Sequence, residues 1–356
     1  MTANYALLAL LAQQPAPQWT IAPELPSPTT NNAVVAVNTE RGAAVFSFLG
    51  LDSTKVWSGI HSRSFRWTIG DAEWTEVQPV PGRGRLAATA QAIAGTIYLF
   101  SGYTVDADGS EKSLPNVDIY DPDTDTWSRG ADIPIPVDDA VSGLWNDSLI
   151  YLISGWHDSG NVAYIQFYDP LRDEWHQATP IPGPPVFGHT GSIVGNSIVY
   201  VDGAIPNDGT TRFVLTRSSW RGDIDPDDPT KVTWTQMEHH PGPGLYRAAA
   251  GTIDDRIVFA GGTDNPYNYN GVGYNDVGAQ PVDRVFAFDL AVGGWLELGT
   301  LPLPSMDHRG IAVVDGVMVI VGGMGVGQEV LKRVAVRNRE GGEEGEGDRS
   351  KDGRIN

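Results

Sequence analysis

Asn116–Pro134 reads NVDIYDPDTDTWSRGADIP, and the same pattern returns at Asn161–Pro182 as NVAYIQFYDPLRDEWHQATPIP. Each copy begins with a short apolar run that ends in Tyr, passes through an Asp-Pro turn and continues into a second run. That second run carries a Trp seven residues after the Tyr, at Trp127 and Trp175. Each copy therefore predicts two antiparallel strands joined by a tight turn.

Another pair of strands is predicted immediately upstream of each copy. Leu86–Gly102 reads LAATAQAIAGTIYLFSG and Asp139–Gly155 reads DAVSGLWNDSLIYLISG. Both segments alternate β-branched or aromatic residues with small and polar ones, and turn residues divide each into two strands. Four strands in about 50 residues, repeated along a chain, are typical of a β-propeller.

The number of blades follows from two residue types that recur once per repeat. Glycines end the second strand of each repeat, and tryptophans mark the fourth; they are Gly50, Gly102, Gly155, Gly203, Gly262 and Gly323, and Trp19, Trp74, Trp127, Trp175, Trp234 and Trp295. Trp19 has no three strands before it, whereas Gly310–Gly323 and Val330–Val336 supply three strands with no Trp after them. The sequence thus predicts an all-β, six-bladed propeller whose last blade is closed by the N-terminal strand.

The expected boundaries are residues 13–337 for the propeller, with a different segment at each end. Residues 338–356 are rich in charge and Gly without apolar anchors, so we expect them to be disordered. Residues 1–12 contain the apolar run Tyr5–Ala12, which is too short to span a bilayer. It is either the remnant of a secretory signal or an ordinary terminus. This favours an exported or periplasmic protein and leaves a cytoplasmic location open. Arg221–Lys231 is an acidic insertion that we place in a loop.

Composition excludes several classes of function. With 24 basic and 44 acidic residues, the formal net charge is −20, which argues against general binding to nucleic acid or to anionic membranes. The chain has no Cys, so disulfides, thiolate metal sites and Cys nucleophiles are excluded. Any binding of an anion must come from a local cluster of basic residues.

The apolar strands ending in Gly-Gly, with a following Tyr and a spaced Trp, resemble the kelch repeat. FAGG at Phe259–Gly262 and IVGG at Ile320–Gly323 are examples, and the resemblance covers nearly the whole chain. Six blades closed by an N-terminal strand resemble, more narrowly, the bacterial N-acetylneuraminate epimerases, which act on sialic acid without a cofactor. Similar chains are often labelled galactose oxidase. That copper chemistry requires a Tyr cross-linked to Cys, so the absence of Cys excludes it here.

Strand direction alternates within a blade, so the loops entering the first strand and those joining the second to the third share one face. The opposite face carries short hairpin turns such as Asn146-Asp147 and is interpreted as scaffold. The longer connections Tyr103–Pro115, Trp156–Asn161 and Thr263–Pro281 lie on the first face. The last of these is long for a simple connection and is either a ligand-binding lid or a loop packed on its own blade.

Residues that enter the innermost strands are expected to converge at the central mouth of that face. They are Arg83, Arg85, Asp138, Asp139, His189, Tyr246, Arg247, Asp307, His308 and Arg309. Arg binds carboxylates through two parallel hydrogen bonds, so the cluster favours a small anionic ligand. The alternative is that each Arg or His pairs with an Asp of the neighbouring blade for structural reasons.

These residues are compatible with two functions. The first, implied by the resemblance, is a cofactor-free sugar mutarotase or epimerase that acts on a small acidic sugar, with His308 or His189 as base or acid and Asp139 or Asp307 as its partner. The second is a binding module without catalysis that receives an acidic peptide, protein or glycan. The residues expected to bind the ligand are Arg85, Arg247, Arg309, Tyr246, Tyr103, Trp156, His157, Tyr267 and Tyr269.

No metal site is predicted. Asp121, Asp123 and Asp125 have a calcium-loop spacing, but the required Gly is absent and a turn explains them. The adjacent His239 and His240 precede a Pro-Gly-Pro run and have no carboxylate at a metal-ligand spacing, so they are interpreted as loop residues. The oligomeric state is left open.

Overall fold

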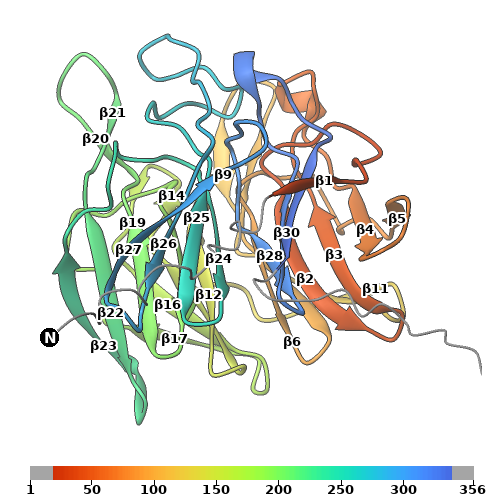
Figure 1. The fold of residues 1–356 in the computed structure, drawn as a ribbon, viewed down its shortest axis with the longest axis horizontal. Coiled ribbons are helices and arrows are strands. Elements are labelled where there is room, and N and C mark those ends of the chain that lie inside the picture. Colours follow the sequence, from red (N-terminus) through yellow and green to blue (C-terminus); the bar gives the residue numbers. More distant parts are fainter. Residues whose placement is uncertain (1–18, 339–356) are drawn as a thin grey trace, which may run out of the picture.

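Six four-stranded antiparallel sheets make up the fold of the computed structural model, which describes residues 19–338 (Figure 1). Within this range the structure is all-β apart from two single-turn 3-10 segments, η1 (Trp57–Gly59) and η2 (Val326–Gln328). The prediction of a six-bladed propeller is confirmed. The predicted terminal segment 1–12 and the predicted tail 338–356 lie outside the described residues, except for Asn338, which ends a strand. No helix between residues 19 and 338 is long and apolar enough to cross a membrane.

The blades follow one another along the chain, and within each blade consecutive strands pair. Blade 1 holds β2 (Ala33–Thr39), β3 (Gly42–Phe48), β4 (Ser64–Thr68) and β5 (Thr75–Val77); blade 2 holds β6 (Thr89–Ile93), β7 (Thr96–Phe100), β10 (Val117–Asp121) and β11 (Thr126–Arg129). Blade 3 holds β12 (Val141–Trp145), β13 (Leu149–Ile153), β16 (Ile165–Asp169) and β17 (Glu174–Ala178); blade 4 holds β18 (Thr190–Val194), β19 (Ser197–Val201), β22 (Ser219–Asp225) and β23 (Asp228–Met237). Blade 5 holds β24 (Ala249–Ile253), β25 (Arg256–Ala260), β26 (Arg284–Asp289) and β27 (Gly294–Thr300).

Blade 6 joins the two ends of the described chain. Its strands are β28 (Ala312–Val314), β29 (Val317–Val321), β30 (Val334–Asn338) and β1 (Thr20–Ala22). β1 pairs with β30 in antiparallel register, with Ile21 opposite Ala335. The N-terminal strand therefore completes the last blade, as predicted, and the ring closes without leaving β30 as a free edge.

The repeated Tyr and Trp are the contacts that hold adjacent blades together. Tyr120 and Trp127 are register partners on β10 and β11, and their ring centroids lie 4.7 Å apart. Phe48 of blade 1 packs edge-on against both rings. The Trp127 indole also donates a hydrogen bond of 3.0 Å to the Gln78 carbonyl in the chain that leaves blade 1. Trp74, Trp175 and Trp295 donate the same kind of hydrogen bond, to Pro23, Ala131 and Glu238, whereas the indole N–H groups of Trp19 and Trp234 have no partner among the described residues. The motif thus supplies both an apolar contact and a hydrogen bond at four of the six interfaces.

Three small hairpins extend the connections between second and third strands. They are β8 (Tyr103–Val105) with β9 (Glu111–Ser113), β14 (Trp156–His157) with β15 (Gly160–Asn161), and β20 (Ala204–Pro206) with β21 (Phe213–Leu215). We call the face that carries them the loop face and the opposite one the turn face. Figure 1 shows β20–β21 standing out at the loop face and the β22–β23 hairpin at the other end of blade 4.

The prediction that Arg221–Lys231 forms a loop is wrong. β22 and β23 remain paired through Ile224 opposite Val232 and on to Asp225 opposite Asp228, which leaves a short turn between them. Ile224 and Val232 are buried against blade 3 because they alternate with the acidic residues along the strands. The acidic composition hid this period-two pattern, and the segment is an extended outer hairpin.

Candidate functional site

A ring of six equivalent residues closes the centre of the propeller at the loop face. Each residue lies just before the first strand of its blade and adopts a left-handed conformation, with φ between 50° and 69°. The six are Asn31, Ala87, Asp139, Gly188, Arg247 and Asp307. Backbone hydrogen bonds link neighbouring members, including Gly188 N–H to the Asp139 carbonyl at 3.0 Å and Arg247 N–H to the Gly188 carbonyl at 2.9 Å. The backbone of every blade therefore helps to fix the ring, which we call the hub ring.

Gly188 is the member of the hub ring that tolerates no side chain. A Cβ added there would lie 2.1 Å from the Tyr246 ring, and φ is +61°. We expect Gly188→Ala to lower the free energy of unfolding by about 2–5 kcal/mol, from the clash and the left-handed backbone together. Gly195→Ala is the matched control, because Gly195 has φ +54° and open space around it, and should cost only about 1–2 kcal/mol, from the left-handed backbone alone. Equal losses in urea unfolding would contradict the steric argument.

The charged members of the hub ring form a buried network with Arg309. Arg247 Nη2 and Nε lie 2.5 and 3.1 Å from the two carboxylate oxygens of Asp139, and Arg247 Nη1 lies 3.2 Å from Asp307 Oδ1. Arg309 Nη2 lies 2.9 Å from Asp139 Oδ1 and 3.5 Å from Asp307 Oδ1. Two arginines and two aspartates therefore compensate one another, as in the pairing that the sequence left open as an alternative.

Electrostatics keep this network ionised. Burial disfavours the charged form of Asp139, but Arg247 and Arg309 outweigh that effect and lower its pKa. Burial by itself lowers the pKa of Arg247, but Asp139 and other neighbouring groups outweigh burial and raise that pKa well above the usual range. The Arg247 guanidinium also lies over the rings of Tyr246 and Tyr267, 4.9 and 5.2 Å from their centroids. Arg247 is thus a fixed positive charge at the floor of the loop face.

A small cavity of about 40 Å³ lies over this floor, which we call the loop-face cavity. Side chains from the hub ring and from the connections of blades 2 to 5 line it; they are Tyr103, Glu111, Asp138, Asp139, Trp156, Phe187, Arg212, Phe213, Arg247, Asn268 and Tyr274. The structure therefore brings together Asp138, Asp139, Arg247, Tyr103 and Trp156, which were predicted from separate repeats.

Two carboxyl groups in the loop-face cavity have raised pKa values. Asp138 is buried, accepts a hydrogen bond of 2.6 Å from the Ser113 hydroxyl, and has a pKa raised well above its usual range by burial and then by neighbouring Asp139. Glu111 lies at the more exposed rim, where partial burial raises its pKa and Arg247 opposes the shift. Asp138 and Asp139 are adjacent in sequence, yet their surroundings move their pKa values in opposite directions.

Asp138→Asn should reduce the dependence of stability on pH. Because the folded pKa of Asp138 is raised, the folded chain binds more protons than the unfolded chain above the ordinary Asp pKa, and stability falls as pH rises through that window. Asn cannot ionise but can still accept the Ser113 hydrogen bond. We expect urea unfolding from about pH 5 to about pH 8 to show a decline smaller by at least about 1 kcal/mol in the variant. Parallel pH profiles would contradict this assignment.

Aromatic side chains form one wall of the loop-face cavity. Trp156, Phe187 and Phe213 contact one another edge to face, with centroids 5.0 to 5.7 Å apart, and Tyr274 lies 4.7 Å from Phe213. The exposed Arg212 guanidinium lies over the Phe213 ring at 5.0 Å and has no ion pair among residues 19–338. A rigid apolar wall beside polar groups is typical of sites that bind polar rings.

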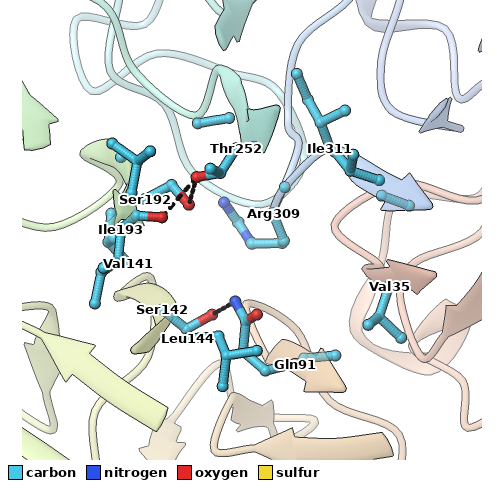
Figure 2. Close-up of a pocket in the computed structure, with 18 of the residues that line it drawn as sticks. Val35, Gln91, Val141, Ser142, Leu144, Ser192, Ile193, Thr252, Arg309 and Ile311 are labelled. Atoms are coloured by element: carbon cyan, nitrogen blue, oxygen red, sulfur yellow. Dashed lines mark hydrogen bonds between the residues drawn. The ribbon is translucent and has the colours of Figure 1, made fainter. Parts of the chain in front are cut away.

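A larger cavity of about 600 Å³ occupies the central channel below the hub network. Residues of the innermost strands line it, and it extends to the turn-face hairpins at Asn146, Asn196 and Asp254. Figure 2 shows Arg309 projecting into this channel, together with the hydrogen bonds from Gln91 to Ser142 and from Thr252 to Ser192. Asp139 lines both cavities, so the hub network lies between them.

His189 and His308 lie one residue beyond the hub ring and are buried. His189 Nε2 lies 2.9 Å from the Ile153 carbonyl, and His308 Nε2 lies 2.9 Å from the Ser305 hydroxyl. Burial lowers the pKa of His189 to about 4 and that of His308 to about 3. Both residues are among those that line the channel, and neither lines the loop-face cavity.

The other predicted residues divide between the hub and the blades. Arg85 turns into blade 2, where it pairs with Asp118 and donates to the Ser101 carbonyl at 2.6 Å. Exposed Arg83 pairs with Asp106 at 2.7 Å, and His157 Nδ1 lies 2.6 Å from the Pro136 carbonyl. Tyr246 and Tyr267 are buried beside Arg247, whereas Tyr269 packs near Tyr103.

Six residues of the loop-face cavity were missing from the predicted set: Glu111, Phe187, Arg212, Phe213, Asn268 and Tyr274. Asn268 and Tyr274 lie in the connection Thr263–Pro281, which the sequence offered as a possible lid. Glu111 lies in the connection Tyr103–Pro115, which the sequence did place on this face. Arg212 and Phe213 lie in the corresponding connection of blade 4, whose length gives the same signal. Phe187 precedes Gly188 of the hub ring and carries no separate signal.

Comparisons with known proteins agree with this architecture. A family profile described as the kelch motif matches residues 84–134. N-acetylneuraminate epimerase 1 of Escherichia coli O6:H1 is 25% identical, with 77% of this chain and 83% of the relative covered, and N-acetylneuraminate epimerase of Yersinia enterocolitica is 22% identical, with 79% and 78% covered. Kelch-like protein 15 of Gallus gallus is 28% identical over 33% of this chain and 24% of its own length.

The solved structure of a protein named YjhT has a TM-score of 0.72 and 18% sequence identity, and the match covers 90% of this chain and 98% of that one. At this identity the likeness bears on the fold alone. The chain is therefore a six-bladed β-propeller that carries a kelch motif and is similar over most of its length to proteins named N-acetylneuraminate epimerase.

Proposed function

We propose that this protein binds a small carbohydrate in the loop-face cavity and accelerates interconversion at its anomeric centre without a cofactor. The observation that carries the proposal is the pair of carboxyls with raised pKa values, Asp138 and Glu111, above the fixed charge of Arg247. Acid–base catalysis commonly uses two carboxyls in different surroundings, and here Asp138 is buried whereas Glu111 lies exposed at the rim. The similarity to N-acetylneuraminate epimerases supports the same class of reaction.

Ring opening of a cyclic sugar requires two proton transfers. One group protonates the ring oxygen as the bond between that oxygen and the anomeric carbon breaks, and another removes the proton of the anomeric hydroxyl as the carbonyl forms. Buried Asp138, which remains protonated at higher pH than an ordinary Asp, suits the acid. Rim-exposed Glu111, whose raised pKa makes its carboxylate a stronger base, suits the base. Reclosure on the other face of the carbonyl reverses both transfers and restores both residues.

The size of the cavity limits how the sugar enters. Its volume of about 40 Å³ is small beside the roughly 300–1,000 Å³ of typical ligand pockets, so it admits the substituents of the anomeric carbon rather than a whole ring. The ring would then rest on the aromatic wall formed with Trp156 and Phe213. Arg212, which has no ion pair among the described residues, would meet the carboxylate of an acidic sugar.

The predicted roles of the histidines stay predictions. His308 or His189 as acid or base would require a ligand in the channel, because both residues line it and neither lines the loop-face cavity. Their lowered pKa values keep both rings neutral at pH 7 and weaken them as bases. Asp139 and Asp307, their predicted partners, are already paired with Arg247.

The alternative is a non-catalytic module that binds an acidic peptide, protein or glycan through exposed Arg212. NMR exchange measurements of anomeric interconversion, made with acidic and matched neutral sugars, separate the two functions. We expect acceleration that is larger for acidic sugars, with Arg212→Gln removing the preference. Binding of an acidic sugar with no acceleration would favour the binding module, and neither binding nor acceleration for any sugar would overturn both.

A further inference from the structure

A buried aspartate and two histidines meet between blades 4 and 5, away from the residues that line the loop-face cavity. Asp202 follows β19, is fully buried and has φ of 57°; His239 and His240 follow β23. His239 Nε2 lies 2.8 Å from Asp202 Oδ1, and His240 Nε2 lies 2.7 Å from Asp202 Oδ2. The nearest ligand atoms of the three residues all lie within 4.8 Å of one another. The fold thus supplies a carboxylate that is remote from the two histidines in sequence.

The two nitrogens of His240 have different neighbours. Nε2 faces the Asp202 carboxylate, and Nδ1 lies 3.0 Å from the Pro241 carbonyl, which accepts a hydrogen bond from Arg284 Nη1. Arg284 Nη1 also lies 3.5 Å from Nδ1, so the Nε2–H tautomer satisfies both nitrogens without a cation. The Nδ1–H tautomer instead donates to Pro241 and leaves the Nε2 lone pair free to bind a metal ion beside Asp202.

We propose that Asp202, His239 and His240 bind one divalent transition-metal ion of the Zn²⁺ type. Two imidazole nitrogens and one carboxylate oxygen are a donor set that suits Zn²⁺, Co²⁺, Ni²⁺ and Cu²⁺ but not Ca²⁺ or Mg²⁺, which prefer oxygen ligands. The His239 side chain is 17% exposed, so the ion has a route from solvent, and water can occupy a remaining coordination position. The site is independent of the proposed carbohydrate reaction.

Surrounding contacts would hold the ligands in place. The Leu245 N–H donates to Asp202 Oδ2 at 2.8 Å, the Pro241 carbonyl faces the other nitrogen of His240, and the His240 ring stacks on Phe286 with centroids 4.6 Å apart. Such contacts fix the tautomer and orientation of metal ligands. Arg284 Nη1 is 3.5 Å from His240 Nδ1, and Glu297 pairs with that arginine and compensates its charge.

Entry of the ion requires a small local movement. Metal–ligand bonds of about 2.0–2.1 Å in a tetrahedral site place neighbouring ligand atoms roughly 3.3 Å apart, whereas the Asp202 oxygens and the histidine nitrogens are now 2.7 and 2.8 Å apart. His239 can supply this change, because it is partly exposed and lies on the connection between β23 and β24.

The test uses the full-length chain after treatment with EDTA and dialysis. Calorimetric titration with ZnCl₂ should give one equivalent of bound metal, and Co²⁺ should produce the absorption of a site with nitrogen and oxygen ligands. His239→Gln should weaken Zn²⁺ binding by at least about tenfold. His176→Gln, which removes an exposed histidine on β17, should leave binding unchanged. CaCl₂ should give no binding heat.

Three outcomes would overturn the proposal. The first is absence of Zn²⁺ binding near neutral pH in wild-type protein, which would mean that the three residues form a hydrogen-bonded cluster only. The second is equal weakening by His239→Gln and His176→Gln, which would mean that surface histidines bind the metal. The third concerns folding of the variant. If His239→Gln loses its far-ultraviolet circular dichroism but binds Zn²⁺ as tightly as the wild type once it is refolded, the residue has a structural role only.

Discussion

Glu111→Gln should slow anomeric interconversion by about 100-fold or more if the loop-face cavity is the catalytic site. A positioned acid or base typically contributes between about 10² and about 10⁴ to a rate, and Gln keeps the size of Glu but cannot take up a proton. The raised pKa of Glu111 also predicts the pH dependence. The carboxylate is the active form, so the rate should rise with pH through that pKa, and Glu111→Gln should remove this limb.

The control for this variant lies on the same hairpin. Asp108 is exposed in the turn between β8 and β9, so Asp108→Asn removes one negative charge without touching the cavity. Its rate should stay within about twofold of the wild type, as for a screened surface charge. If both variants are slowed equally, the effect comes from the general field of the hairpin. If neither is slowed, Glu111 has no role as a base.

Much of the fold could be predicted because each repeat carries the residues that make its own interfaces. Tyr120 and Trp127 pair across one hairpin and pack on the preceding blade, so their spacing reports a blade directly. Gly102 ends a second strand with φ of +92°, and a Cβ there would lie 2.7 Å from the Leu86 carbonyl. These requirements are local in sequence. Arg221–Lys231 was misassigned because an acidic strand pair has no strong local signal.

The candidate site could be predicted only in part, because sequence spacing does not show in which direction each side chain points from the hub. Repeat register correctly brought Asp139, Arg247 and Asp307 together, since they occupy equivalent positions of the hub ring. Arg85 lies two residues before its own member of that ring and turns into blade 2, toward Asp118. Glu111 and Arg212 reach the cavity through the folding of two hairpins, and sequence spacing gives no measure of that reach.

Arg247→Met should lower the free energy of unfolding by about 3–5 kcal/mol. Arg247 and Arg309 together compensate Asp139 and Asp307, so removing Arg247 leaves one cation for two buried carboxylates, and one negative charge stays without compensation. Its side chain is only 2% exposed, so water cannot solvate the carboxylates left behind. Met keeps the length of the apolar stem and contact with Tyr246 and Tyr267, which confines most of the loss to the charge.

Two further variants separate electrostatic loss from lost packing. Arg83 is a matched exposed arginine, with a side chain 60% exposed and paired with exposed Asp106, so Arg83→Met should cost no more than about 1 kcal/mol. Asp139→Asn in the Arg247→Met background should restore part of the stability, because it removes a carboxylate that lacks its main partner. Urea unfolding followed by tryptophan fluorescence measures all three proteins. No restoration in the double variant would mean that packing, rather than the buried charge, makes Arg247 essential to the hub.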